Sequence, residues 1–594
     1  MTICAPTSKI TQRGDTLGGI NLTIVISAPY EEVLRVQTYH HMGVQKKAPS
    51  FEIAPAESGH LKAEDTEDKL VISSGTLRLE VQKENGALTF YRGEEKITAS
   101  GWRDLAYMKT DWKGFAYDKG PEDAYMREQL SLSVGELIYG LGERFSAFVK
   151  NGQSVDIWNE DGGTSTEQSY KNIPFYISNK GYGVFVNHPE RVSFEVATEM
   201  VTKVEFSVPG ENLDYFLING PTMKEVLMRY TDITGKPSLP APWTFGLWLS
   251  TSFTTNYDEK TVNSFVDGMF DRKIPLSVFH FDCFWMKDFH WTDFLWDERV
   301  FPDPEGMLSR MKAKGLKICV WINPYISPAT ELYEKMEPYT ASHSVWCGIV
   351  PDYTLPEAQQ IADNHFKKNQ LDIGVSGYKL DENDGYDYWL WPDVATFPSG
   401  NAAEQIRQIY GSLLQNITVR MYHKQNKRTY GLVRSGNAGT SSFPYVIYND
   451  YYNHKDFITA LINSSFIGIL WTPEVRASQT AEEWLRRMQT VCFSPIAMLD
   501  AWADGTKPWS FPEVTQQVND IAKLRMQLIP YLYTTFANYA FKGIPPVRAM
   551  NLEEGYQEES KLEEGKLDAT ANPYAMALKK EAKDQFMVGE YLLV

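Results

Sequence analysis

Apolar and polar residues alternate in short runs along the first 235 residues, as they do in half-buried β-strands. Residues 77–81 alternate with a period of two, an Asn-Gly turn follows, and the alternation resumes at 87–91, which predicts a hairpin. Residues 192–196 and 204–208 repeat this pattern ahead of a Pro-Gly turn. We therefore predict an antiparallel β-sandwich domain over residues 1–235.

The pattern changes at about residue 236, where short apolar runs begin to alternate with amphipathic stretches. One stretch predicts a helix with Asp303 as its N-cap, Pro304 at its first position and Gly315 as its stop. Helical segments separate most of the apolar runs, and eight βα units are the number that closes a parallel barrel. We therefore predict an α/β fold, with a (β/α)8 TIM barrel over residues 236–545. The eight strand candidates are 245–249, 276–282, 317–325, 375–381, 429–434, 445–450, 467–471 and 494–499.

The length and charge of the chain exclude several classes of protein. Its 594 residues exceed what one hydrophobic core usually holds, which agrees with two or more domains. The 58 Lys and Arg residues against 76 Asp and Glu residues leave a formal net charge of −18, which argues against a nucleic-acid partner. No apolar stretch approaches the roughly 20 residues that cross a bilayer, so we predict no membrane partner.

The cysteines and the missing motifs argue against a metal or redox protein. Five cysteines are scattered without a CxxC pair, and no G-x-S-x-G, H-E-x-x-H or phosphate-loop motif is present. We predict neither a metal nor a cofactor. The odd number of cysteines and the lack of an apolar leader segment predict a cytoplasmic location. Trp, Tyr and Phe make up 13% of the chain, which is typical of a large aromatic core and also of carbohydrate sites.

Charged residues follow several predicted barrel strands, at the ends where the βα loops of a barrel build an active site. Asp381 ends the fourth strand and Asp450 the sixth, so the two carboxylates face each other across the barrel mouth. Glycoside cleavage requires such a pair, because one acid protonates the leaving oxygen while the other attacks the anomeric carbon or activates water. Lys379 lies on the same side of its strand and would keep Asp381 ionised. Arg434 would act on a substrate hydroxyl or a neighbouring acid, and His280 is predicted to be structural.

Three segments of the chain resemble glycoside hydrolase family 31, especially its bacterial α-xylosidase and α-galactosidase branches. These segments are 139–189, 246–289 and 296–326, and they contain the strings YGLGERFSAFVKNG, FHFDCFWMKDF and KICVWINPYI. The resemblance extends over nearly the whole chain and implies a retaining, two-step mechanism. It implies that Asp381, in a Lys-x-Asp pattern, is the nucleophile. Asp450, which follows an Arg-Ser segment and a Phe-Pro pair, matches the acid/base.

The same resemblance implies a sugar subsite and, as partner, a small oligosaccharide or glycoside. A Trp-Thr-Pro-Glu sequence stands where the family has Trp-Ser-His-Asp, and residues 382–400 depart from the family's Phe-Gly-Glu. These departures resemble the α-galactosidase branch more closely. We therefore predict a retaining, exo-acting α-galactosidase, with an α-xylosidase of the same family as the alternative. The residues that match the subsite are Phe253, Asp282, Cys283, Phe284, Trp321, Lys379, Arg434, Trp471 and Glu474.

The sequence of residues 546–594 leads to one further prediction about the domains. The family's barrel is normally followed by β-domains whose first strand resembles residues 588–594. We therefore expect residues 546–594 to form the barrel exit and the start of a truncated C-terminal β-domain. A non-catalytic sugar-binding protein is then a further alternative, and a transglycosylase is a third activity. The sequence leaves the oligomeric state open, a homo-oligomer included.

Overall fold

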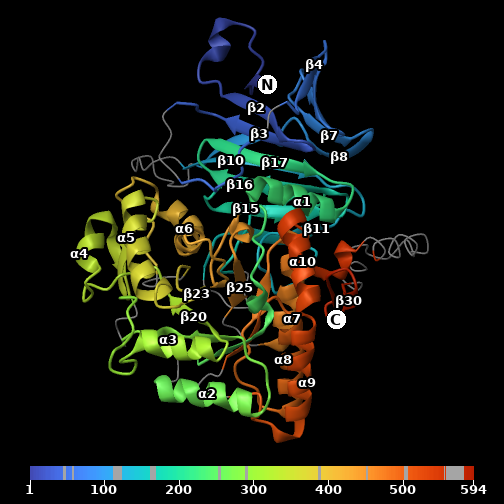
Figure 1. The fold of residues 1–594 in the computed structure, drawn as a ribbon. Coiled ribbons are helices and arrows are strands. Elements are labelled where there is room, and N and C mark those ends of the chain that lie inside the picture. The colour runs from blue at the N-terminus through green and yellow to red at the C-terminus, as the bar shows by residue number, and fades with distance from the viewer. Residues whose placement is uncertain are drawn as a thin grey trace.

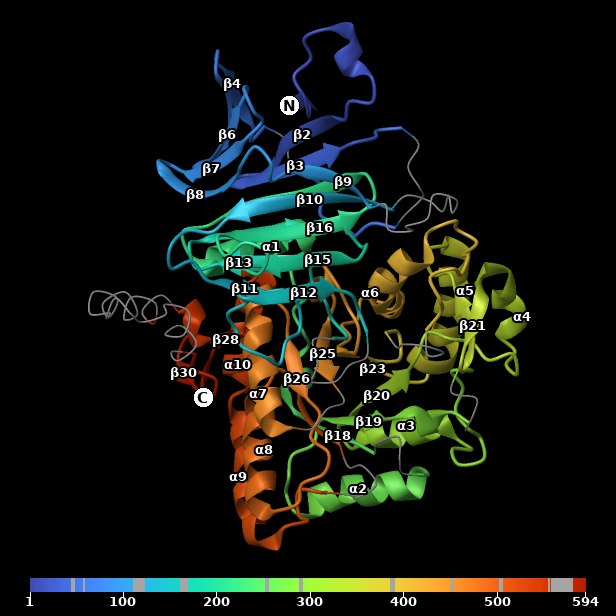
Figure 2. The same cartoon turned by 180° about the vertical axis from the view of Figure 1, so that it is seen from behind.

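The computed structural model describes the whole chain except residues 44–48, 57–58, 111–122, 161–168, 252–255, 288–291, 385–389, 450–452, 501–505, 554–555 and 557–580. A β-rich N-terminal half, drawn in blue to green, lies across one end of an α/β barrel drawn in green to orange (Figure 1). Figure 2 shows the same two parts from behind, with the last strands of the chain beside the barrel and below the sandwich.

Three antiparallel sheets make up the described part of the N-terminal half. The first, in the order β1-β2-β3-β17-β14-β13-β11, contains β1 (Thr2–Pro6), β2 (Asn21–Tyr30), β3 (Val33–Tyr39), β11 (Ile138–Gly140), β13 (Phe175–Ser178), β14 (Tyr182–Val186) and β17 (Asn212–Asn219). The second, in the order β12-β15-β16-β10-β9, contains β9 (Ala106–Thr110), β10 (Asp123–Ser131), β12 (Gln153–Ile157), β15 (Val192–Val196) and β16 (Lys203–Pro209). The third, in the order β4-β5-β6-β7-β8, contains β4 (Lys62–Asp65), β5 (Lys69–Ser74), β6 (Leu77–Gln82), β7 (Leu88–Arg92) and β8 (Glu95–Ser100).

Both hairpins expected from the alternating pattern are present. Strands β6 and β7 pair with Leu79 opposite Phe90, and Gly86 in their turn has a φ of +73°, a conformation that glycine adopts without strain. Strands β15 and β16 pair with Phe194 opposite Phe206. The predicted antiparallel β-sandwich is confirmed.

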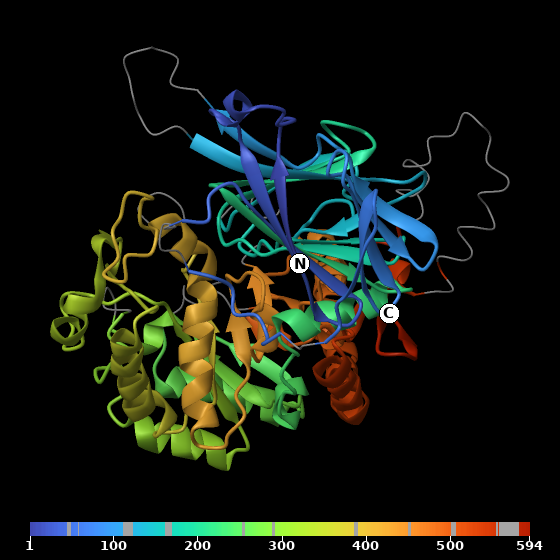
Figure 3. The same ribbon diagram turned by 90° about the horizontal axis from the view of Figure 1, so that it is seen from above.

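Strands β11, β13, β14 and β17 of the first sheet are buried on both faces, and this places the sandwich directly on the barrel. Along β17, Leu217 belongs to the apolar core of the sandwich, whereas its neighbour Phe216 belongs to the core shared with the barrel. Helix α1 (Met223–Thr234) packs on this second face, where its Tyr230 stacks on Phe175 with a centroid distance of 4.0 Å. Figure 3 shows the sheets from above, lying across the barrel.

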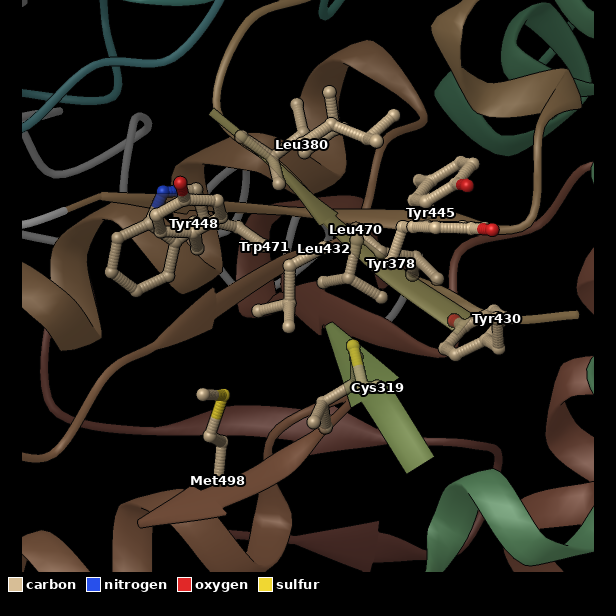
Figure 4. Packing of buried hydrophobic residues seen from close by; sticks show 14 of the residues in the cluster. Cys319, Tyr378, Leu380, Tyr430, Leu432, Tyr445, Tyr448, Leu470, Trp471 and Met498 are labelled. Atoms are coloured by element: carbon tan, nitrogen blue, oxygen red, sulfur yellow. The ribbon is translucent and has the colours of Figure 1, made fainter. Parts of the chain in front are cut away.

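Within the described residues, eight parallel strands form the sheet of the C-terminal half. A parallel bridge between Val475 and Leu499 brings its two outermost strands together, so the sheet is nearly closed and the predicted barrel is confirmed. Cys319, Leu432 and Met498 belong to three of these strands and point toward the same interior (Figure 4). In chain order the strands are β18 (Leu247–Ser250), β19 (Val278–Phe281), β20 (Lys317–Ile322), β23 (Gly377–Leu380), β24 (Gly431–Val433), β25 (Tyr445–Asn449), β26 (Trp471–Pro473) and β27 (Ala497–Asp500).

Helices cover the outside of the barrel (Figures 1 and 2). The helix predicted from its caps is present, because Asp303 accepts a hydrogen bond from the N–H of Gly306, Pro304 begins the helix and Gly315 has a φ of +89°. The helices of this half are α2 (Glu259–Asp271), α3 (Pro304–Ala313), α4 (Tyr333–Met336), α5 (Pro356–Phe366), α6 (Ala403–His423), α7 (His454–Asn463), α8 (Ala481–Phe493), α9 (Thr515–Gln527) and α10 (Ile529–Lys542).

The seventh barrel strand lies later in the sequence than we predicted. Residues Ser464–Ile467 form a short 3-10 helix, and Gly468 follows with a φ of +69°. A left-handed residue interrupts an extended run, so the strand begins only at Trp471 and not at residue 467. Glu474 therefore follows the carboxyl end of this strand directly.

Two small antiparallel sheets complete the described structure. A hairpin of β21 (Thr340–Val345) and β22 (Gly348–Pro351) is inserted between β20 and β23. Strands β28 (Val547–Ala549), β29 (Phe586–Val588) and β30 (Leu592–Leu593) follow the barrel. The domain boundaries at residues 235 and 545 stay a prediction. In the part of the chain that the structure describes, no helix has the length and apolarity to cross a membrane.

Candidate active site

Three donors hold the carboxylate of Asp381 at the carboxyl end of β23. The indole N–H of Trp321, on the neighbouring strand β20, donates to Oδ2 at 2.8 Å. The backbone N–H of Glu382 donates to Oδ1 at 2.8 Å, and Nη1 of Arg434 lies 3.1 Å from the same oxygen. Asp381 remains 7% exposed. These three donors fix the direction of a carboxylate that keeps a small exposed fraction.

The turn that follows this carboxylate is strained and firmly held. Glu382 has a φ of +56°, a left-handed conformation that residues other than glycine rarely adopt. The hydroxyl of Tyr325 donates to the Glu382 carbonyl at 2.6 Å, and the amide of Asn323 donates to the Glu382 side chain at 3.3 Å. This turn places the Glu382 N–H against the carboxylate of Asp381.

A buried cluster of charges lies beside this site. Nζ of Lys379 lies 2.8 Å from Oε1 of Glu474 and 3.3 Å from Oδ2 of Asp282, and the three side chains are at most 2% exposed. The ring of Tyr448 lies 4.7 Å from the same ammonium group. The cluster connects the ends of β19, β23 and β26. We predicted that Lys379 keeps Asp381 ionised; in the structure the cation paired with Asp381 is Arg434.

The charge network continues on both sides of this cluster. Nη2 of Arg476 lies 3.1 Å from Oε2 of Glu474, and its Nε lies 3.7 Å from Oδ2 of Asp500 at the end of β27. On the other side, Nε of Arg434 lies 3.0 Å from Oδ1 of Asp384, whose side chain is fully buried. Arg434 therefore bridges Asp384 and the carboxylate of Asp381, which fixes the plane of its guanidinium group.

Two uncharged groups lie against these charges. Burial, reinforced by the charge of Asp282, raises the pKa of the Cys283 thiol well above its ordinary value, so the thiol stays protonated. Burial, reinforced by Lys379, lowers the pKa of His280 well below its ordinary value, so its imidazole stays neutral. Nδ1 of His280 lies 2.9 Å from Oγ of Ser250, and its Nε2 has no partner among the described residues. His280 is a buried residue of the barrel interior, with half of its hydrogen-bonding capacity used.

Four residues predicted for the site remain, and two of them, Phe284 and Trp471, lie within the described part of the chain. Phe284 is half-buried and packs against the barrel core. Trp471 is fully buried, and its indole N–H donates to Glu143 at 2.7 Å. Phe253 and Asp450 lie outside the described residues, so their roles stay predictions. Among the described residues, no group of three His, Cys, Asp or Glu side chains is placed to hold a metal ion.

The structure adds residues of the sandwich that the sequence did not single out. Tyr170 places its ring 4.6 Å from the guanidinium carbon of Arg434. The next residue, Lys171, pairs with Glu143, and neither side chain is exposed. Isolated polar residues in a β-rich segment carry no periodic signal, and only the docking of the sandwich on the barrel brings them to the site.

Two domain families match the chain. The family described as Glycosyl hydrolases family 31 TIM-barrel domain matches residues 237–535, and the family described as Glycosyl hydrolase 31 N-terminal galactose mutarotase-like domain matches residues 23–195. The chain belongs to glycoside hydrolase family 31. This confirms the resemblance on which the expected nucleophile and subsite residues rest, although their individual roles stay predictions.

Known proteins similar to this family 31 chain include two α-xylosidases. One, from Emericella nidulans, is 37% identical over 580 residues, which cover 91% of this chain and 73% of that protein. Alpha-xylosidase XylQ from Lactiplantibacillus pentosus is 43% identical over 394 residues, which cover 64% of this chain and 50% of that protein. A solved structure described as a GH31 α-xylosidase from a soil metagenome complexed with xylose has a TM-score of 0.79 at 20% identity, over 96% of this chain and 89% of that one, and so shares the fold.

Proposed function

We propose that this family 31 chain is a retaining, exo-acting α-xylosidase that hydrolyses terminal α-linked xylose through a covalent glycosyl-enzyme. The names of the two relatives above support α-xyloside, our alternative prediction, over α-galactoside, our first. The observation that carries the proposal is the carboxylate of Asp381, held by three donors at the barrel mouth. A nucleophilic carboxylate has to be ionised and fixed in direction, and these contacts serve both needs.

The two oxygens of Asp381 are not equivalent, and their difference supports Oδ2 as the attacking atom. Among the described residues, Oδ1 accepts from Arg434 and from the N–H of Glu382, whereas Oδ2 accepts from the neutral indole N–H of Trp321 alone. Oδ2 therefore keeps more of the negative charge and attacks the anomeric carbon. In the resulting ester, Oδ1 is the carbonyl oxygen and retains both of its donors.

Asp450 is the second catalytic group in this proposal. As Oδ2 of Asp381 bonds to the anomeric carbon, the bond to the leaving oxygen breaks and Asp450 transfers its proton to that oxygen. In the second step, Asp450 takes a proton from water, the water oxygen bonds to the anomeric carbon, and the ester bond to Asp381 breaks. Each step inverts the anomeric carbon, so the released sugar keeps its α configuration.

The buried charge cluster explains exo action and sugar binding in the same proposal. Lys379, Asp282 and Glu474 close the lumen with side chains that are at most 2% exposed, so a chain-terminal sugar can enter but an internal one cannot pass through. The same charged groups are strong partners for sugar hydroxyls. Cys283 contributes a neutral thiol beside them.

The test is a panel of 4-nitrophenyl α-xyloside, α-galactoside and α-glucoside with the full chain, followed by NMR of the first sugar anomer released. We expect the xyloside to give the highest kcat/KM and α-xylose to form first. Asp381→Ala should lower kcat by roughly 10⁴-fold or more with unchanged circular dichroism. The matched control is Asp372→Ala, which removes an exposed carboxylate paired with Lys367 and should keep full activity.

Other outcomes would favour the alternatives. A higher kcat/KM for the galactoside would restore the α-galactosidase prediction, and release of the β anomer would overturn retention. Binding of sugars without hydrolysis of any glycoside would favour a non-catalytic sugar-binding protein. Transfer of xylose to an added sugar acceptor in preference to water would identify a transglycosylase.

A further inference from the structure

A buried ion pair of the sandwich lies at its contact with the barrel. Nζ of Lys171 lies 3.3 Å from Oε1 of Glu143, and both side chains are 0% exposed. Oγ of Ser169 donates to the other oxygen of Glu143 at 3.0 Å. Burial lowers the pKa of Lys171, and the neighbouring carboxylate of Glu143 opposes that shift. The pair is therefore held from the sandwich side and is sealed from solvent.

Both members of the pair also bind barrel strands. Nζ of Lys171 donates to the backbone carbonyl of Tyr448 on β25. The indole N–H of Trp471 on β26 donates to Oε1 of Glu143 at 2.7 Å. The pairing of β24 with β25 ends one residue before Tyr448, so Lys171 supplies a donor on the side where the ladder with β24 has stopped, while the pairing of β25 with β26 continues to Asn449. The ion pair thus holds the carboxyl end of β25 and the first residue of the adjacent strand β26.

Tyr170, the residue before Lys171, connects the ion pair to Arg434 and so to the proposed nucleophile Asp381. The ring of Tyr170 lies 4.6 Å from the guanidinium carbon of Arg434 and 4.6 Å from Nζ of Lys171. Arg434 in turn pairs with Asp381 at 3.1 Å. A parallel backbone bridge between Lys171 and Gly436 fixes this segment on the loop that follows β24.

Stability alone does not account for this pair. Two charges lose their hydration when they are buried, and replacing such a pair by apolar side chains of similar volume is often neutral or stabilising. A pair with fixed bonds to two strand ends, by contrast, sets the positions of those ends. Strand β25 ends at Asn449, and the next residue in the sequence is Asp450, the proposed acid/base.

We propose that Glu143 and Lys171 are positioning residues through which the sandwich holds the end of β25, and with it the proton that Asp450 delivers to the leaving oxygen. This inference rests on the proposed function. It gives the N-terminal domain a role in the first chemical step. A displaced acid slows the reaction only where the leaving group needs its proton, and this dependence is the signature of the role.

The experiment compares Lys171→Met and Glu143→Gln with the wild-type chain on three α-xylosides: phenyl α-xyloside, 4-nitrophenyl α-xyloside and α-xylosyl fluoride. Phenol is a poor leaving group and needs protonation, whereas fluoride leaves with little assistance. We expect both variants to lose kcat/KM by about 10- to 100-fold on the phenyl xyloside and by less than about 3-fold on the fluoride. Glu143→Gln keeps an acceptor for Trp471, so it is the milder change and keeps the test available if Lys171→Met fails to fold.

The matched control is Lys203→Met, which removes a lysine that pairs with Asp104 inside the sandwich. It should leave the ratio of the phenyl and fluoride rates unchanged. An equal loss on all three substrates in the Lys171 and Glu143 variants, or no loss, overturns the positioning role. A wild-type chain that hydrolyses none of the xylosides overturns the proposed function instead, so the two failures are distinguishable.

Discussion

Trp321 donates its indole N–H to Oδ2 of Asp381 at 2.8 Å, and the two residues lie on neighbouring parallel strands of the barrel. This bond orients the carboxylate, because its other oxygen is already held by a backbone N–H and a guanidinium group. The direction of the proposed nucleophile is therefore set by three elements that are far apart in the sequence.

Trp321→Phe should lower kcat by roughly 10- to 100-fold on 4-nitrophenyl α-xyloside. Without the indole donor the carboxylate turns away from the line of attack, and small displacements of a reacting group are costly. Steady-state kinetics measure the loss. Trp248→Phe removes an equivalent bond, from a buried indole to the carbonyl of Thr244, and should change kcat by less than about 3-fold. Equal effects of the two changes would argue against an orienting role for Trp321.

Arg434→Lys should lower kcat/KM by roughly 100-fold although the charge is conserved. A lysine cannot place donors on Asp381 and Asp384 at once, because it lacks the planar fork of arginine. Kinetics and a thermal midpoint measured together separate lost activity from lost stability. Arg420→Lys changes an arginine that pairs with Asp363 outside the site and should retain activity. A fully active Arg434→Lys variant would contradict this prediction.

Lys379→Met should destabilise the folded chain by roughly 3–5 kcal/mol at pH 7, because it leaves two buried carboxylates without their shared cation. Thermal unfolding measures the change. Adding Glu474→Gln to Lys379→Met removes one of the two carboxylates that have lost this cation and should recover part of the lost midpoint. If the double variant is less stable than Lys379→Met alone, the cluster is not held by the charge balance described here.

Glu128 should make the stability of the sandwich fall as the pH rises from about 4.5 to about 7. Burial raises the pKa of this carboxyl from 4.5 to about 7, with Ser100, Tyr215 and the N–H of Gln129 as its hydrogen-bond donors. In that window the folded chain keeps the proton and the unfolded chain releases it, so the unfolded state binds fewer protons. This rise in the pKa of Glu128 corresponds to a loss of about 3 kcal/mol in the free energy of unfolding across the window.

Glu128→Gln should remove this dependence, so the variant gains thermal midpoint relative to wild type between pH 5 and pH 8. Glu199→Gln, at an exposed position of the same domain, should follow the wild-type curve. Parallel curves for Glu128→Gln and wild type would show that Glu128 does not titrate in this range.

Much of the fold could be predicted because its elements depend on local patterns. The period-two alternation at 77–81 and 87–91 suffices for a hairpin, and a cap such as Asp303 with Pro304 suffices for a helix start. The seventh strand was placed too early, since apolar residues at 467–470 satisfy a strand pattern equally well. The left-handed conformation of Gly468 decides there between the predicted strand and the observed later start at Trp471.

The candidate site was predicted in part. Asp381 and Arg434 meet at the barrel mouth as acidic and basic strand ends should, because βα loops gather these ends in one place. The role predicted for Lys379, to keep Asp381 ionised, stays a prediction, because residues two apart on one strand share a face but do not have to touch. The cation instead reaches the ends of β19 and β26.

By itself the sequence determined the two-part architecture, the strand that carries Asp381 and the family, because periodicity, caps and long motifs are properties of neighbouring residues. Only the tertiary structure decided which cation pairs with which acid, and that Glu143, Tyr170 and Lys171 of the sandwich reach the barrel strands. These contacts join residues separated by hundreds of positions. They exist because a sheet with four strands buried on both faces docks the sandwich onto the barrel, and no local pattern encodes that docking.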